Sequence, residues 1–453
     1  MHARVSARIM AQHERSRSAP AALRPILVVA FLLISGVFAY TALRSGHHGD
    51  PRPWLYAIAI AGLFVARGLH LNRPVTLAHS TIALLLVALA EFGYRAEHPH
   101  AGFAMLSASG AVLMLPVRSR PEPQSMYRVS ALVDRTVLDP LAPFALHSMK
   151  SYYFNDAGTA AIAYHARAGM AVVSGDPIGD EAAFENVIAE FCAFARSRGW
   201  RVTVLGAGER CLKTWQVSAT PPLRQVPIGR DVVIDVANFN LDGRKFRNLR
   251  QAVSRTHNFG VTTEILSEHA LSEETRDELL AVVDQWKSGR QTRGFSMILD
   301  HLLDGRNPGM LVVIARDIEG RVVGFQRYGS SARGRELTID VPWRAKHAPN
   351  GIDERMIVDL VEYGKSQGVQ RISLAFAAFP ELFTDTDRSF GSRVCYRLVH
   401  FGDPLLNLES LYRFLRKFHA LGEQRFVLVR LRELVPAAFA LLTLEFVPHR
   451  RQH

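Results

Sequence analysis

The chain has 453 residues, carries a formal net charge of +12 at pH 7 and draws 48% of its residues from the hydrophobic types. This length and apolar content exceed one ordinary domain and allow sizeable cores, which excludes an intrinsically disordered protein. The three cysteines, Cys192, Cys211 and Cys395, are far apart and show neither CxxC nor cysteine/histidine ligand spacing. The spacing argues against a disulfide scaffold or a zinc site and predicts reduced thiols in the core.

Apolar residues concentrate near the N-terminus. Uncharged runs cover residues 26–43, 53–66, 74–90 and 101–117, separated by short polar loops. The first and third runs approach the length that spans hydrocarbon, whereas the second is short and depends on flanks such as Trp54 and Leu69. We therefore predict about four transmembrane helices in residues 26–117, with three as the alternative. A cleaved signal peptide is the alternative for the first run, but no small-residue cleavage site stands out.

Basic residues orient this region. Residues 1–25 hold five arginines, and Arg118, Arg120 and Arg128 follow the fourth run. The loop between the third and fourth runs has Arg95 against two glutamates. By the positive-inside rule, a basic N-terminus at 1–25 and a linker at 118–149 both face the cytoplasm. The sequence thus predicts a multi-pass protein of the plasma membrane with a cytosolic body.

The body after the linker has the pattern of an α/β fold in two parts, residues 150–267 and 268–432. In the first part, residues 159–179 hold two β-rich runs around a turn at 166–169, and residues 184–195 have helical spacing. "RVTVLG" and "DVVIDV" predict two further strands, and residues 241–260 predict a helix.

The second part repeats this order before a C-terminal tail at 433–453. A helix at 279–286 precedes strands in "MLVVIARD", "RVVGFQRYGS" and "ELTIDV", the loop "PWRAKHAPNG", a helix around 356–361 and the strand "RISLAFA". Strand hairpin, strand, loop, helix and strand is the order of an acetyltransferase-like (GNAT) module. Its repetition predicts tandem GNAT-like modules that share a groove.

The segment "LDGRKFRNLRQAVSRTHNFG" is unusually basic. No carboxylate occurs from Gly243 to Thr263. At about 100° per residue, its arginines share one arc and its apolar residues another, which predicts a basic amphipathic helix that binds a polyanion. The alternatives are a solvated helix face or a patch that lies on anionic lipid headgroups. The cations concerned are Arg244, Lys245, Arg247, Arg250 and Arg255.

Several blocks resemble one family. "YYFNDAGTAAIAYHARAGMAVVSGDPIG", "IGRDVVIDVANFNLDGRKFRNLRQAVSRTHNFG", "RGFSM", "ELTIDVPWRAKHAPNGIDERMIVDLVEYGKSQGVQRISLAF" and "SLYRFLRKF" are similar, in order, to the phosphatidylglycerol lysyltransferase C-terminal domain. That domain is the synthase part of the multiple peptide resistance factor proteins, and the resemblance covers about residues 150 to 430.

The resemblance implies a membrane-bound transferase with tandem GNAT-like modules. Such enzymes move an aminoacyl group, typically lysyl or alanyl, from aminoacyl-tRNA to a glycerol hydroxyl of phosphatidylglycerol. The implied partners are aminoacyl-tRNA, as co-substrate in place of a cofactor, and phosphatidylglycerol among other anionic lipids. Less negative surface charge would then weaken attraction of cationic peptides, which is a form of antibiotic resistance. Members that also flip the product lipid have many more helices, so we expect that half to be absent.

The chemistry is compatible with the residues. An aminoacyl ester is already activated, so the enzyme needs to align a hydroxyl with its carbonyl, help remove the proton and stabilise the oxyanion. No metal and no covalent nucleophile is required. A basic face would bind the polyanionic donor through its phosphates.

The resemblance also implies site residues. Asp340 matches the aspartate of the family's Asp-Leu-Met-Arg motif, and Lys417 matches a family lysine; both are predicted to be catalytic. Their structural alternatives are a strand-end turn residue and a snorkelling cation on an amphipathic helix. For Asp176, in a Gly-Asp-Pro block, a helix-capping role is favoured over a ligand role. The predicted substrate-binding residues are Arg344, Lys346, Asp176, Tyr412 and Arg413.

The chain departs from the family pattern at three places, one of which is "IGRD" in place of a more acidic "IGEE"-like sequence. Trp343 stands where the motif has its arginine, with Arg344 one residue later, and Thr292 stands where related members often have glutamate.

Two rival classes follow. One is a CoA-dependent acyltransferase, although the loop after "ELTIDV" lacks the Arg/Gln-x-x-Gly-x-Gly/Ala pyrophosphate pattern. The other is a catalytically silent membrane protein that binds tRNA or anionic lipid.

Overall fold

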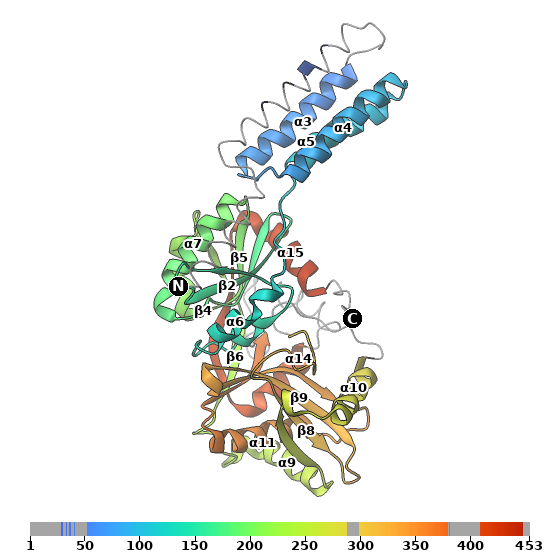
Figure 1. Ribbon diagram of the computed structural model, residues 1–453. Helices are drawn as coiled ribbons and strands as arrows, with labels where there is room; N and C mark the ends of the chain where they lie inside the picture. The colour runs from blue at the N-terminus through green and yellow to red at the C-terminus, as the bar shows by residue number, and fades with distance from the viewer. Residues whose placement is uncertain are drawn as a thin grey trace, which may run out of the picture.

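The computed structural model describes residues 52–287, 299–378 and 408–446, together with Val29, Leu33, Gly36, Val37, Tyr40 and Pro380. Three long helices stand on one end of an α/β body (Figure 1). They are α3 (Arg52–His70), α4 (Leu77–Arg95) and α5 (Pro99–Leu113). The second, third and fourth apolar runs lie on these helices, whereas most of the first run lies outside the described residues.

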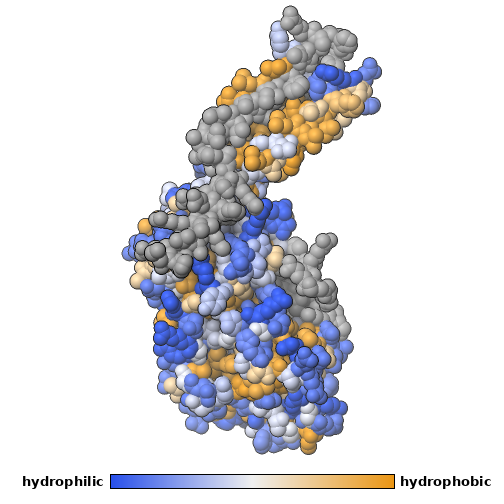
Figure 2. All heavy atoms as spheres, viewed as in Figure 1, coloured by the Kyte–Doolittle hydropathy of each residue, from blue (hydrophilic) through white to orange (hydrophobic). Residues whose placement is uncertain are grey.

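The three helices pack through one face and expose apolar side chains on the others. Ala61, Val87 and Leu106 are buried between them, whereas Leu63 and Phe92 are 71% and 70% exposed. The surface of this part is accordingly hydrophobic (Figure 2). Within the described chain, α4 alone has the length and apolarity of a membrane span, and α3 holds a shorter apolar stretch. The four-span arrangement therefore stays a prediction.

Residues 118–149, predicted as a linker, form a packed bridge between the halves of the body. The bridge contains α6 (Met126–Val133) and a 3-10 turn, η2 (Ala142–Leu146). The backbone N–H of Leu138 donates to Glu336 of the second half at 2.8 Å, and the hydroxyl of Thr338 donates to the carbonyl of Pro140 at 2.9 Å. On the other side, Leu132 and Leu146 pack with residues of the first half in one core cluster.

Each half contains three antiparallel strands, a helix and a parallel strand. In the first half these are β1 (Ser151–Phe154), β2 (Ala160–Arg167), β3 (Met170–Ser174), α7 (Phe184–Ser197) and β5 (Arg201–Gly208), with the short β4 (Ile178–Gly179) beside β2. In the second half they are β8 (Leu311–Arg316), β9 (Val322–Ser331), β10 (Glu336–Arg344), α11 (Ile352–Gln367) and β11 (Arg371–Ala378).

The two halves exchange their last strands. The first half continues through α8 (Leu212–Ser218) into β6 (Arg224–Asp235), which pairs with β11 of the second half. The second half continues through α14 (Leu408–Leu415) into β12 (Leu421–Val429), which pairs with β5 of the first half. Because β6 and β12 also pair with each other, one sheet runs through both halves in the order β1-β2-β3-β5-β12-β6-β11-β10-β9-β8-β7.

The remaining elements cover this sheet. β7 (Thr262–Ser267) forms its far edge, α10 (Glu273–Lys287) packs beside β9 and β10, and α15 (Leu434–Phe446) packs on β3. The basic helix α9 (Arg247–Asn258) packs on α11. Gly351, with φ +101°, allows this approach because a Cβ there would lie 2.9 Å from the carbonyl oxygen of Ala252. Short 3-10 turns occupy Pro123–Ser125, Glu181–Ala183, Glu209–Cys211, Arg244–Phe246, Glu268–Ala270, Ala332–Gly334, Arg416–Phe418 and Leu431–Glu433.

Apolar periodicity explains the two main cores. Val187, Ile188 and Phe191 bury one face of α7 against the first half of the sheet, which also includes Phe426 and Leu428 from β12. In the second half, α9, α11 and α14 bury apolar faces on β6, β10 and β11. Cys192 and Cys211 are buried free thiols, as predicted; Cys395 lies outside the described residues.

Candidate active site

Arg327, on the buried strand β9, organises a fully buried ion cluster. Its guanidinium donates to Glu268 at 2.6 and 3.2 Å and to Asp340 at 3.1 Å, and all three side chains are 0% exposed. Burial raises the pKa of Asp340 to about 6, although the Arg327 charge and the N–H of Leu299 act in the opposite direction. The same guanidinium donates to the carbonyls of Asp300 and His301 at 3.3 and 3.0 Å. The cluster therefore fixes the segment that begins at Leu299.

Asp340 occupies a β-bulge. The register between β9 and β10 shifts at this point, so that Asp340 is the extra residue between Ile339 and Val341. One carboxylate oxygen accepts the backbone N–H of Leu299 at 2.8 Å, and the other accepts from Arg327. The predicted catalytic carboxylate is thus enclosed, and these contacts suit a positioning role. Direct participation of Asp340 in catalysis stays a prediction.

The two residues at the altered motif lie on opposite faces of β10. Trp343 is 3% exposed and packs in a core beside Phe325, whereas Arg344 extends from the opposite face of the strand and is 46% exposed at its side chain. Arg344 lies 3.7 Å from Asp353 in the first turn of α11, and burial raises the pKa of that carboxyl. Lys346, two residues later, is exposed. The motif's cation is therefore displaced by one residue and remains accessible.

Lys417 contacts the same turn of α11. Its ammonium lies 2.6 Å from Oε1 of Glu354, which follows Asp353. Tyr412 is buried in the second-half core, and Arg413 is exposed on α14. Among the predicted site residues, Arg344 and Lys417 are thus gathered around the start of α11. Asp340 instead contacts Arg327.

Asp176 belongs to a different cluster, in the first half. Arg425 on β12 donates to Asp231 and Asp139 at 2.8 Å each, and lies 3.7 Å from Asp176. Asp176 accepts the N–H of Gly208 at 2.8 Å, and a Cβ on Gly208 would meet that oxygen at the same distance. Burial and the charge of Asp139 raise the pKa of Asp176 to about 7. The structural alternative for Asp176 is favoured, but as an ion-cluster member instead of a helix cap.

Four of the five basic residues predicted to bind tRNA are exposed at the surface. Arg244, Lys245, Arg247 and Arg255 are exposed. Arg250 is half-buried and donates to the carbonyls of Leu241 and Gly243, so part of its role is to hold the turn before the helix. Helices α9 and α11 lie at the end of the body opposite to α3–α5 (Figure 1).

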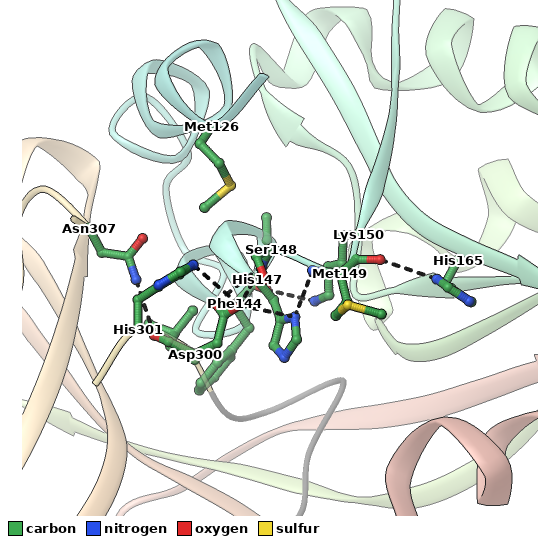
Figure 3. Close-up of polar contacts among 12 residues, drawn as sticks. Met126, Phe144, His147, Ser148, Met149, Lys150, His165, Asp300, His301 and Asn307 are labelled. Atoms are coloured by element: carbon green, nitrogen blue, oxygen red, sulfur yellow. Dashed lines mark hydrogen bonds and ion pairs between the residues drawn. The ribbon is translucent and has the colours of Figure 1, made fainter. Parts of the chain in front are cut away.

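A cluster that the sequence analysis missed lies where the halves meet (Figure 3). Asp300 accepts the backbone N–H of Ser148 at 3.2 and 3.0 Å, and lies 4.0 Å from His147 and 3.7 Å from His301. His301 Nδ1 lies 2.8 Å from the Asp304 carboxylate. The available signal was Arg327 itself, because a cation inside the apolar strand "VVGFQRYG" requires buried partners. In the described part of the chain, no group of three or more histidine, cysteine, aspartate or glutamate side chains is placed to hold a metal ion.

The repeated strand–helix–strand pattern defines a tandem GNAT-like transferase fold, as predicted. The sequence profile described as phosphatidylglycerol lysyltransferase, C-terminal, matches residues 130–429. The chain belongs to this family and is an enzyme of the transferase class.

Individual relatives agree with this assignment. The MprF-like domain protein Rv1619 of Mycobacterium tuberculosis is 51% identical over 403 residues, which are 88% of this chain and 83% of the relative. The lysylphosphatidylglycerol biosynthesis bifunctional protein LysX of Rhodococcus jostii is 31% identical over 309 residues, 67% of this chain but 27% of the relative. The chain thus matches only about a quarter of LysX.

Two solved structures share the fold. L-PGS from Bacillus licheniformis superposes with a TM-score of 0.60 at 22% identity, covering 74% of this chain and 99% of that one. A DUF2156 C-terminal domain from Agrobacterium fabrum gives a TM-score of 0.63 at 23% identity, covering 72% and 98%.

Proposed function

We propose that the chain transfers an aminoacyl group, lysyl or another, from aminoacyl-tRNA to a glycerol hydroxyl of phosphatidylglycerol at the cytoplasmic face of the plasma membrane. Membership of the phosphatidylglycerol lysyltransferase family supports the lipid acceptor and the transferase chemistry. The product would reduce the negative charge of the membrane surface and weaken its attraction of cationic peptides.

The observation that carries the tRNA part of the proposal is the separation of two surfaces. The apolar helices α3–α5 stand at one end of the body, and the exposed cations of α9 lie at the other (Figures 1 and 2). A basic patch that served anionic headgroups would have to lie beside the membrane helices. The opposite position favours a large polyanion that approaches from the cytosol, and tRNA has that chemistry.

Arg344 and Lys346 are the proposed anion ligands at the start of α11. Arg344 is displaced by one residue from the family's motif but is accessible, and Lys346 is exposed beside it. Their charges suit a lipid phosphate or the 3′ end of the tRNA. Lys417, held by Glu354, would support the same region.

Lipid mass spectrometry tests the proposed reaction. A host that contains phosphatidylglycerol is transformed with the chain or with an empty vector, and the lipid extracts are compared. We expect a new species with the mass of phosphatidylglycerol plus an aminoacyl residue, whose mass names the amino acid. Absence of such a lipid, with the chain present in the membrane, would contradict the proposal, and a new acylated species without an amino group would favour the CoA-dependent alternative.

A further inference from the structure

The segment from Leu299 to Asn307 is held rigidly although it has no regular secondary structure. The buried Arg327 binds the carbonyls of Asp300 and His301, Asp340 binds the N–H of Leu299, and Glu268 accepts the N–H of Gly305 at 3.1 Å. His301 adopts a positive φ of 55°. Such a conformation is unusual for a residue other than glycine and persists where the surroundings enforce it. The ion cluster thus serves to present His301 in one orientation.

The contacts of His301 fix the position of its proton. Nδ1 lies 2.8 Å from Oδ2 of Asp304, and because a carboxylate only accepts, Nδ1 carries the hydrogen. The neutral ring therefore has its lone pair on Nε2. Oδ2 of Asp300 lies 3.7 Å from Nε2, too far for a hydrogen bond. The side chain is 25% exposed.

The neighbouring groups leave His301 as the imidazole of this cluster that is placed to accept a proton. His147 Nδ1 accepts the backbone N–H of Met149 at 3.2 Å, so that nitrogen holds no proton for Asp300, and the His147 side chain is 5% exposed. The two oxygens of Asp300 accept from Ser148. Arg306 lies 3.3 Å from Asp304 and shares that carboxylate with His301. The pair of His301 and Asp304 has the geometry in which a carboxylate orients an imidazole for proton transfer.

We propose that His301 is the general base of the transfer reaction, oriented by Asp304. This inference rests on the proposed aminoacyl transfer. Nε2 takes the proton of the acceptor hydroxyl while the hydroxyl oxygen bonds to the ester carbonyl carbon. The bond from that carbon to the tRNA ribose oxygen then breaks, and the imidazolium returns its proton to this leaving oxygen. The product is an ester of the acceptor, and the released tRNA has a free ribose hydroxyl.

Substitution of His301 tests the proposal in the full-length, detergent-solubilised chain, with labelled aminoacyl-tRNA and phosphatidylglycerol micelles. In His301→Asn, the side-chain amide still donates to Asp304 and asparagine tolerates the positive φ, but the base is absent. We expect the turnover rate to fall by about 10²- to 10⁴-fold, the usual contribution of a general base, with KM little changed. The decline in rate at acidic pH that protonation of an imidazole base produces should disappear as well.

Two further variants keep the result interpretable. His301→Gly suits the positive φ and opens a space for added imidazole, which should restore part of the rate if a base is missing. His269→Asn is the matched control, because His269 is an exposed histidine beside Gly305 that has no part in the proposed mechanism. Its rate should equal that of the wild type.

The outcomes distinguish a wrong assignment of the general base from a wrong assignment of the reaction. A wild-type rate in His301→Asn would overturn the role of His301 and leave the proposed function intact. A slow His301→Gly variant that melts at the wild-type temperature but does not respond to imidazole would also contradict a base. A wild-type chain that forms no aminoacyl lipid would overturn both inferences.

Discussion

Asp340 matches the aspartate of the family motif and also neutralises the buried charge of Arg327. Its carboxylate has no solvent exposure and is divided between Arg327 and the N–H of Leu299. Removal of one member of a buried ion cluster leaves an uncompensated charge, which is more costly than the loss of a surface pair. At this residue, a loss of activity alone would not distinguish chemistry from stability.

Asp340→Ala should therefore destabilise the chain. We expect the free energy of unfolding to fall by about 3 to 5 kcal/mol, since Arg327 retains one carboxylate and Leu299 loses its acceptor. Asp340→Asn keeps an acceptor for Leu299 and should lose less. Chemical unfolding in detergent measures both, with Asp277→Ala as an exposed carboxylate control that should change the value by no more than about 0.5 kcal/mol. An inactive Asp340→Ala variant of wild-type stability would instead indicate direct chemistry.

The raised pKa of Asp176 predicts that the free energy of unfolding depends on pH. Its folded pKa of about 7 exceeds the ordinary value of 3.8, so the folded chain retains a proton that the unfolded chain releases. The contribution of Asp176 to the free energy of unfolding is therefore fully present below about pH 4, and it is lost as the pH rises through 7. Asp176→Asn removes this loss, so its stability relative to wild type should increase by on the order of 4 kcal/mol from about pH 4 to about pH 8. An unchanged difference across this range, as expected for the exposed control Asp242→Asn, would contradict the assignment.

At the scale of elements, α9 has a structural role on one face and a proposed binding role on the other. Leu249 and Ala252 face the core, and the exposed arginines face away from it. Because phosphate contacts release counterions, their contribution to tRNA affinity should depend on salt.

Reversal of Arg244, Arg247 and Arg255 to glutamate tests this role. We expect KM for aminoacyl-tRNA to rise by at least about tenfold, and the slope of log affinity against log salt to decrease by about two. Reversal of Arg196, Lys213 and Arg224, exposed cations of the first half, should have a much smaller effect. Equal effects of the two triple variants would mean that net charge, and not α9, attracts the tRNA.

Local patterns predicted most elements but not their pairing. The apolar spacing of Phe184, Val187 and Phe191 indicated α7, and the turn before Gly169 indicated the β2–β3 hairpin. The insertion of β12 between β5 and β6 joins residues about 200 positions apart, such as Arg425 and Gly208, and no local pattern reports such a contact. The bulge at Asp340 was hidden for the same reason, since it is defined by the partner strand and not by the β10 sequence.

The candidate site was predictable in part. Family-like blocks led to Arg344 and Lys417, which lie at one turn of α11. Asp300 and His301 were missed because their significance depends on Arg327 and Ser148, which are remote in sequence. Thr292, one of the departures from the family, lies outside the described residues.

At the scale of the whole molecule, one sheet runs through both halves because each half completes the other. The junction brings the Asp300–His301 segment of the second half against Ser148 before β1. The apolar helices and the basic helix lie at opposite ends of this continuous body (Figure 1). Such an arrangement allows a lipid acceptor and a tRNA donor to approach from different sides.

Transfer of a labelled aminoacyl group to phosphatidylglycerol by the purified chain is the most direct test of the proposed function. The chain is incubated with phosphatidylglycerol micelles and a full set of charged tRNAs, with or without prior RNase treatment. We expect a labelled lipid in the untreated sample and none after RNase. Equal lipid labelling after RNase, or no labelled lipid with any charged tRNA, would contradict aminoacyl-tRNA as the donor.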